Sequence, residues 1–123
     1  MSMHPFAHAN ASSVQEAVEA LTETCRPLAG GTDLLALMKE GLSAPEVLVS
    51  LKRIPSLGQM MTGRNGWRIG AMVKLASIAA HYTMSRLPCL EQAIMQSASP
   101  QLRHMATLGG NLAGTIHYHE ALL

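Results

Sequence analysis

Apolar residues in the first third of the chain recur at the spacing of an amphipathic helix. Four of them fall at i, i+3, i+4 and i+7 on one helical face: Val14, Ala17, Val18 and Leu21. Ser12 or Ser13 precedes this run, and either side chain can cap a helix. The pattern therefore predicts a helix that starts after these serines and ends near Thr24.

Two short apolar runs then frame a second helix. Cys25 to Ala29 and Val47 to Leu51 have the composition of buried strands. Between them, Thr32 to Glu40 is predicted to be a helix that Thr32 caps and Gly41 terminates. A strand, helix and strand of this size predict a right-handed parallel unit, which binds ligands beyond the carboxyl ends of its strands.

The pattern changes after Gly58. Asn65 and Gly66 form a strong hairpin signal, and two short strands are predicted on either side of it, at residues 59–62 and 67–70. Helices are predicted at residues 75–81 and from Pro88 onwards, the latter with Leu90, Ala93 and Ile94 along one side. From Ser99 onwards the chain is polar and punctuated by glycines, and residues 107–111 are interpreted as a loop.

Composition and charge narrow the class of protein. The chain has 123 residues, 48% of them hydrophobic and 14% charged, which favours a globular fold. Nine basic residues against eight acidic ones give a formal charge of +1, so no broad electrostatic surface for nucleic acid is predicted. Only two cysteines occur, and no apolar run approaches the roughly 18 residues of a membrane span. We therefore expect a cytoplasmic protein without a membrane span.

The first glycine pair has the clearest functional pattern. Gly30 and Gly31 stand between the first predicted strand and the following helix, where main-chain amides could hold an anion such as a phosphate. The same pair could simply turn the chain. Neither G-x-G-x-x-G nor G-x-x-x-x-G-K-[ST] is present in the expected place, which disfavours a dinucleotide Rossmann fold and a nucleoside triphosphatase.

No other residues form a convincing catalytic or metal-binding set. His117, His119 and Glu120 stand near the carboxyl end without further ligands nearby, so no metal site is predicted. Arg53, Arg64 and Arg103 are interpreted as surface charges, with Arg103 retained as a possible cleft residue. No general base is assigned, and the set of catalytic residues is empty.

Four ordered stretches resemble one family, the FAD-binding domain of molybdenum hydroxylase flavoprotein (medium) subunits, of the xanthine dehydrogenase and carbon monoxide dehydrogenase type. The stretches read PLAGGTDLLALMK from Pro27, LVSLKRIPSL from Leu48, RIGAMVKLASIAAH from Arg68 and ASPQLRHMATLGGNLA from Ala98. The resemblance implies an α+β, two-lobed FAD-binding domain. Residues 1–57 are expected to form a small parallel βαβ lobe, and residues 58–123 an incomplete second lobe with antiparallel strands and helices.

The resemblance also implies which residues bind the cofactor, FAD. The first glycine segment would wrap the pyrophosphate through its main-chain amides, with these residues around it: Leu28, Ala29, Gly30, Gly31, Thr32, Asp33 and Leu34. The second segment would approach the same cofactor from the other lobe, with these residues: Ala98, Ser99, Ala106, Thr107, Gly109, Gly110 and Asn111. Asp33 is expected to turn into its loop and accept amide hydrogen bonds. A bulky residue at Gly30 or Gly31 is predicted to weaken FAD binding more than folding.

In such a family the flavoprotein subunit takes electrons from iron–sulfur clusters and passes them through FAD to an acceptor. The expected partners are therefore a molybdopterin-binding large subunit and an iron–sulfur small subunit, and the chain would serve as an oxidoreductase subunit only within that complex. The resemblance fades after Asn111, so the chain is interpreted as truncated. The alternatives are a non-catalytic remnant or interaction module without flavin, and a small protein that binds another phosphate-bearing ligand.

Overall fold

The computed structural model describes residues 3–81 and 83–114. Its strands and α-helices follow this order: β1 (Ala7–Asn10), α1 (Val14–Ala20), β2 (Cys25–Leu28), α2 (Leu34–Lys39), β3 (Val47–Ser50), β4 (Met60–Gly63), β5 (Gly66–Ile69), α3 (Leu75–Ala79), α4 (Pro88–Gln96) and α5 (Pro100–Arg103). Two 3₁₀ turns, η1 (Pro55–Gly58) and η2 (Met84–Arg86), join them. Residues 108–114 are also helical.

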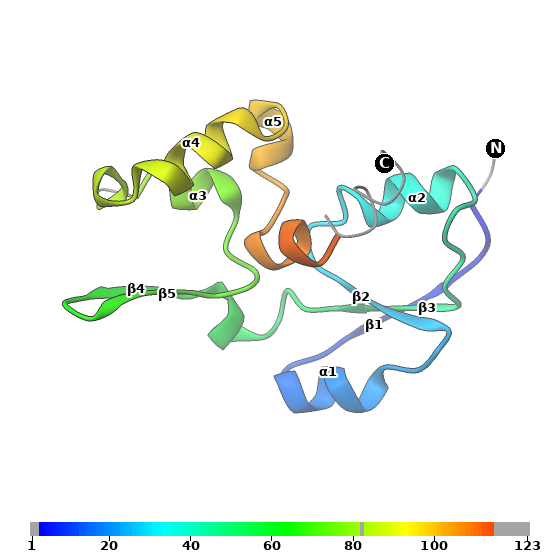
Figure 1. Cartoon of the computed structure of the whole chain (residues 1–123). Helices are drawn as coiled ribbons and strands as arrows, with labels where there is room; N and C mark the ends of the chain where they lie inside the picture. The colour runs from blue at the N-terminus through cyan, green and yellow to red at the C-terminus, as the bar shows by residue number, and fades with distance from the viewer. Residues whose placement is uncertain (1–2, 82, 115–123) are drawn as a thin grey trace.

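The first lobe is a three-stranded parallel sheet in the order β1-β3-β2. The chain crosses the sheet from β1 to β2 and then returns to β3 in the centre, so two right-handed crossovers place their helices on opposite faces. Figure 1 shows this arrangement, with α1 below the sheet and α2 above it. The predicted parallel strand–helix–strand unit is confirmed in β2, α2 and β3.

Helix α1 begins where the serines predict it. The Ser13 hydroxyl accepts a hydrogen bond from the Glu16 amide at 3.0 Å, and the Glu16 carboxylate accepts from the Ser12 amide at 2.9 Å and from its hydroxyl at 2.7 Å. This reciprocal arrangement satisfies donors at the helix start. The pKa of Glu16 is lowered because the Ser12 amide, and then its hydroxyl, stabilise the ionised carboxylate.

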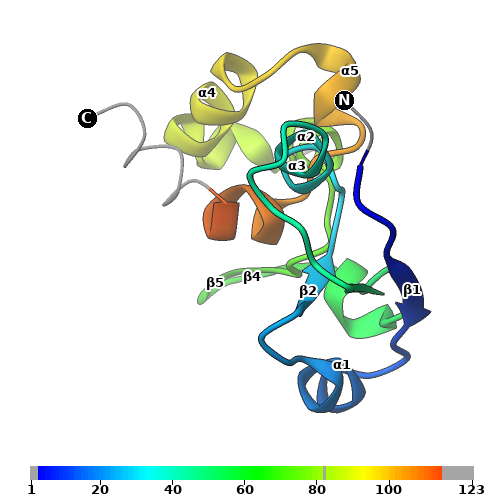
Figure 2. The same ribbon diagram turned by 90° about the vertical axis from the view of Figure 1, so that its right-hand side faces the viewer.

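The apolar face of α1 is only partly covered. Ala17 is buried, and it packs with Cys25 and Val49 in the core of the first lobe. Val18 is 61% exposed and Val14 is 48% exposed, although both belong to the same helical face. The views in Figures 1 and 2 place α1 on the side of the sheet away from α4 and α5, so the second lobe leaves this face open.

The second lobe joins the β4–β5 hairpin to α3, α4, α5 and the helical residues 108–114. The two strands pair antiparallel from Met60↔Ile69 to Gly63↔Gly66, as the Asn65–Gly66 signal predicts. Ile78, Met84 and Ile94 lie in the core of this lobe, and Trp67 from β5 packs against it. The Trp67 ring meets the His81 ring edge to face, with 5.7 Å between ring centroids.

Three local predictions differ from the structure. Strand β1 was not expected, because Ala7 to Asn10 shows no apolar alternation and all four residues are exposed. Residues 107–111 are not a loop, since residues 108–114 are helical, and α5 before them was not predicted. The cap position of α2 is occupied by Asp33 instead of Thr32, and its side chain makes no capping hydrogen bond.

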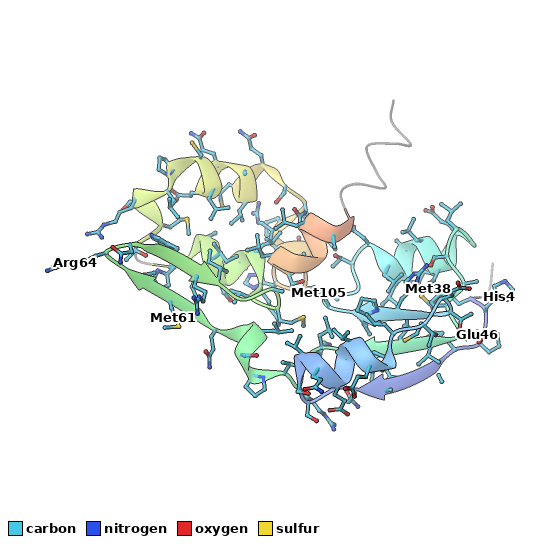
Figure 3. All side chains as sticks on the ribbon, turned by 60° about the horizontal axis from the view of Figure 1, so that its bottom comes forward. His4, Met38, Glu46, Met61, Arg64 and Met105 are labelled. Atoms are coloured by element: carbon cyan, nitrogen blue, oxygen red, sulfur yellow. The ribbon has the colours of Figure 1, made fainter. Side chains whose placement is uncertain are left out.

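The predicted fold class is confirmed: a small parallel lobe is followed by a second lobe with an antiparallel hairpin and helices. The two lobes meet through the main chain near Met105, which lies close to the middle of the molecule in Figure 3. Among the described residues, no helix has the length and apolar character needed to cross a membrane.

Candidate functional site

A cavity of about 750 Å³ opens between the two lobes, at the carboxyl ends of β2 and β3. From the first lobe it is lined by the residues that follow β2, by Leu34 and Leu37 of α2, and by Leu51. From the second lobe it is lined by Ala98 and by residues of the segment from 106 to 114. This volume lies in the range of small-molecule and cofactor pockets.

The cavity brings the two predicted glycine segments together. All predicted site residues line it except Leu28 and Ser99: Ala29, Gly30, Gly31, Thr32, Asp33, Leu34, Ala98, Ala106, Thr107, Gly109, Gly110 and Asn111. The Ser99 hydroxyl instead accepts a hydrogen bond from the Leu102 amide at 3.3 Å, which caps α5. Contact of these residues with a flavin stays a prediction.

The first glycine segment presents main-chain donors to the cavity. Among the described residues, the amides of Gly30, Gly31, Thr32 and Asp33 donate to no acceptor. Buried or half-buried amides of this kind are normally paired, so four consecutive ones at a cavity wall indicate a place for an external acceptor. An anion with several oxygens, such as a diphosphate, matches this set of donors.

The glycines of this segment are required by packing as well. A Cβ on Gly30 would overlap the main-chain carbonyl oxygen of Met105 and would lie only 3.0 Å from its carbonyl carbon. Gly31 has a φ of +77°, and a Cβ there would lie 3.1 Å from a methyl group of Leu35. The absent side chain of Gly30 therefore makes room for the second lobe, and that of Gly31 permits a left-handed turn.

Asp33 does not take the predicted role. Its carboxylate accepts no capping hydrogen bond from α2, and an oxygen of the carboxylate lies 3.1 Å from the place a Cβ on Gly114 would take. The side chain thus lies against Gly114, at the end of the helical residues 108–114, instead of turning into its own loop. It brings a negative charge to the cavity wall.

The second glycine segment is built differently from the first. The amides of Leu108 and Gly109 donate to the carbonyls of Val73 (3.0 Å) and Ala71 (2.8 Å). The Gly110 amide donates to the Thr107 hydroxyl at 3.1 Å, and the Asn111 amide to the Thr107 carbonyl at 3.0 Å. These four amides are therefore engaged within the protein, and among residues 106–111 only the Thr107 amide donates to no described residue.

This geometry corrects the interpretation of the second glycine pair as part of a loop, because Gly109 and Gly110 lie in the helical residues 108–114. Gly109 packs against Ala71, because a Cβ at Gly109 would lie 2.7 Å from the Ala71 Cβ. Thr107 is 2% exposed, and its hydroxyl caps the helical residues that follow. The pair supplies close packing at a helix start, while the first pair supplies free donors.

Arg26 is a cavity residue that the sequence did not indicate. It is the only positively charged residue among the described residues that line the cavity. Its guanidinium Nη1 lies 3.4 Å from the carbonyl oxygens of Glu23 and Cys25, near the start of β2. Arg103, retained as a cleft residue from the sequence, does not line the cavity; its Nη1 donates to the Met95 carbonyl at 2.8 Å.

Among the described residues, no group of three or more His, Cys, Asp or Glu side chains is placed to hold a metal ion. His117, His119 and Glu120 lie outside the described residues. Cys25 is buried and Cys89 is exposed, and both are free thiols.

Comparison with known proteins identifies the family. Residues 4–122 match the family model described as the FAD binding domain in molybdopterin dehydrogenase. The chain belongs to this family. FAD, predicted from the four sequence stretches, is thereby confirmed as the cofactor of the domain family.

Individual members of the FAD-binding domain family agree in sequence and fold. The carbon monoxide dehydrogenase medium chain of Afipia carboxidovorans is 38% identical over 112 residues, covering 88% of this chain and 39% of the relative. The structure of carbon monoxide dehydrogenase from Hydrogenophaga pseudoflava matches with a TM-score of 0.86 at 33% identity, covering 92% of this chain and 41% of that one.

A third relative acts on a different compound. The structure of quinoline 2-oxidoreductase from Pseudomonas putida 86 matches with a TM-score of 0.85 at 29% identity, covering 92% of this chain and 41% of that one. The FAD-binding domain described here therefore spans about two fifths of the length of these relatives.

Proposed function

We propose that this chain holds FAD in the flavoprotein subunit of a molybdenum-containing dehydrogenase or hydroxylase. We place the diphosphate of FAD against the amides of residues 30–33, which have no acceptor among the described residues, inside the cavity between the lobes. The observation that carries this proposal is the run of four unengaged donors at the wall of a cavity of about 750 Å³. Membership of the FAD-binding family supports the same assignment.

The two lobes would bind the cofactor by different means. The first segment offers hydrogen-bond donors, and Arg26 adds the positive charge that a diphosphate favours. The second segment offers a rigid wall in which Ala106 and Thr107 are both buried. We place the boundary between the lobes at residues 57 and 58, since one hydrophobic cluster draws on residues up to Leu57 and the other begins at Met60.

The flavin, when bound, supplies the redox chemistry that takes electrons from iron–sulfur clusters and delivers them to an acceptor. The chain itself binds and orients the cofactor, and we assign no proton-transferring residue to it. The partners we propose are the molybdopterin-binding large subunit and the iron–sulfur small subunit of the same complex. The names of the relatives support this, because they are medium chains and complex subunits.

The proposal is tested by ligand titration of the protein, with and without co-expressed large and small subunits. FAD, FMN, riboflavin and ADP are added, and binding is followed by flavin fluorescence and by thermal stabilisation. FAD is expected to bind most tightly, since riboflavin has no phosphate and FMN lacks the second one. Absence of flavin absorbance and of FAD-dependent stabilisation in both preparations would overturn the proposed function.

A further inference from the structure

Ala98 has an unusual backbone conformation at the cavity wall. Its φ is +54°, and no other non-glycine residue among the described ones has a positive φ. Ala98 also lines the cavity from the second lobe. A left-handed conformation is unfavourable for an alanine because its Cβ approaches the following carbonyl oxygen. Such a residue persists only where the surrounding structure enforces it.

Hydrogen bonds fix the chain on both sides of Ala98. The preceding residue, Ser97, donates to the Ile94 carbonyl through its amide at 3.1 Å and through its hydroxyl at 2.8 Å. The following residue, Ser99, accepts the Arg103 amide on its carbonyl at 3.0 Å. Ala98 is therefore the junction between the end of α4 and the start of α5.

Arg103 joins these two helices directly. Its guanidinium Nη1, on α5, donates to the main-chain carbonyl of Met95 at 2.8 Å, eight residues earlier in the last turn of α4. The last carbonyls of a helix have no partner within the helix, and a cation placed there is also favoured by the helix dipole. The side chain spans the Ala98 junction without lining the cavity itself.

We propose that Arg103 is a positioning residue: by holding the end of α4 to α5, it keeps Ala98 in its left-handed conformation and fixes the cavity wall against which the flavin nucleotide binds. This inference rests on the proposed function. A purely structural role for Arg103 would stabilise the second lobe and leave the wall at Ala98 unaffected. Glycine at position 98 separates these two roles, because glycine adopts a positive φ without the Cβ penalty.

The test compares four proteins: wild type, Arg103→Met, Ala98→Gly and the double variant. Each is prepared together with the partner subunits where expression requires them. Arg86→Met is the matched control, since Arg86 is an exposed arginine of the same lobe whose side chain bonds to no described residue. FAD affinity is measured by fluorescence titration. Exchange of the Ser97 amide proton is measured without ligand, because that amide donates to Ile94.

Arg103→Met is expected to weaken FAD binding by about tenfold. Without the hydrogen bond of Arg103, Ala98 is no longer held in its unfavourable left-handed conformation, and this factor corresponds to the cost of that conformation. The substitution is also expected to accelerate exchange at Ser97. Ala98→Gly in the Arg103→Met background should restore most of the FAD affinity, and Arg86→Met should change neither readout. Arg103→Lys, which keeps a donor, is the second variant if Arg103→Met fails to fold, and its loss should be smaller.

If the wild type binds FAD, two results would overturn the inference. One is an Arg103→Met protein that binds FAD like the wild type, and the other is a double variant that binds no better than Arg103→Met. If the wild type itself binds no FAD, the proposed function fails. Exchange of the Ser97 amide proton then remains as the one test of whether Arg103 holds the junction at Ala98. Unchanged exchange at Ser97 in Arg103→Met would overturn the positioning role.

Discussion

Gly30 of the first lobe lies directly against the main-chain carbonyl group of Met105 in the second lobe. The two residues are far apart in the sequence, and their main chains touch where the cavity begins. The first glycine segment therefore has two functions that cannot be separated at this position. It presents free amides to the cavity, and it forms the joint between the lobes.

Gly30→Ala is accordingly expected to destabilise the protein even without flavin. The added methyl group would overlap the Met105 carbonyl, and overpacking of this kind lowers the free energy of unfolding by about 1–3 kcal/mol. This differs from the sequence-based expectation that binding would suffer more than folding. Urea unfolding followed by the emission of Trp67, the single tryptophan, measures the change.

Gly58→Ala is the matched control for Gly30→Ala, because a Cβ at Gly58 meets nothing within 4 Å. Its free energy of unfolding should stay within about 0.5 kcal/mol of the wild type. If Gly30→Ala were as stable as Gly58→Ala, the close approach of Gly30 and Met105 would be wrong.

Thr107→Val is expected to destabilise the second lobe by about 1–2 kcal/mol. The valine keeps the shape of the threonine and removes the hydroxyl that accepts the Gly110 amide at 3.1 Å. That amide would lose its acceptor next to a side chain that is 2% exposed. Thr107→Ser, which keeps the hydroxyl, is the control, and equal urea midpoints for the two variants would contradict the capping role.

The sequence predicted the apolar strands and the positions of both glycine segments, but it could not distinguish their roles. Val47 to Ser50 is apolar enough to be identified as a strand, whereas Ala7 to Asn10 becomes a strand only by pairing with it. The helical residues 108–114 were missed because Gly109 and Gly110 disfavour a helix locally. The Thr107 cap and the packing of Gly109 on Ala71 stabilise the helix there, and both depend on contacts distant in sequence.

For a similar reason, the sequence predicted where the site lies but not its hydrogen-bond pattern. A motif locates glycines, but only the hydrogen-bond pattern shows that the amides of residues 30–33 have no acceptor in the described part of the chain, while those of residues 108–111 do. Arg26 had no signal, because a single arginine on an edge strand resembles any surface charge. The hydrogen bond from Arg103 to Met95 joins two helices, one of which, α5, was not predicted from the sequence.

The two charged residues of the cavity wall should have opposite effects on FAD binding. Arg26→Gln removes the positive charge and is expected to weaken FAD binding, while Asp33→Asn removes a negative charge and is expected to strengthen it. Riboflavin has no phosphate, so its affinity should change in neither variant. Titrations at low and high salt provide the measurement, and equal effects on FAD and riboflavin would argue against a diphosphate near these residues.

Glu16 should make the stability of α1 depend on pH. Its folded pKa is lowered by the Ser12 amide and hydroxyl, so its stabilising contribution is present above the unfolded pKa of about 4.3 and is lost as the pH falls through the folded pKa. Glu16→Gln should therefore be less stable than the wild type at pH 7 and nearly equal to it at pH 2. Urea unfolding at both values measures this, with Glu19→Gln as the control on the same helix. A constant difference between Glu16→Gln and the wild type at both pH values would contradict the assignment.

Val18 and Ala17 are neighbours on α1, and substitutions at the two should differ sharply. Val18 is 61% exposed, so Val18→Ser is expected to change the free energy of unfolding by no more than about 0.5 kcal/mol. Ala17 is 6% exposed and packs in the first-lobe core, so Ala17→Leu should cost about 1–3 kcal/mol through overpacking. Chemical unfolding of both variants tests this contrast. Helical periodicity alone assigns the two residues to one face, and only the position of the sheet determines which of them is buried.

A large loss of stability from Val18→Ser in the assembled complex, but not in the separate chain, would locate a partner on α1. A large loss of stability in the separate chain would contradict the exposure of Val18.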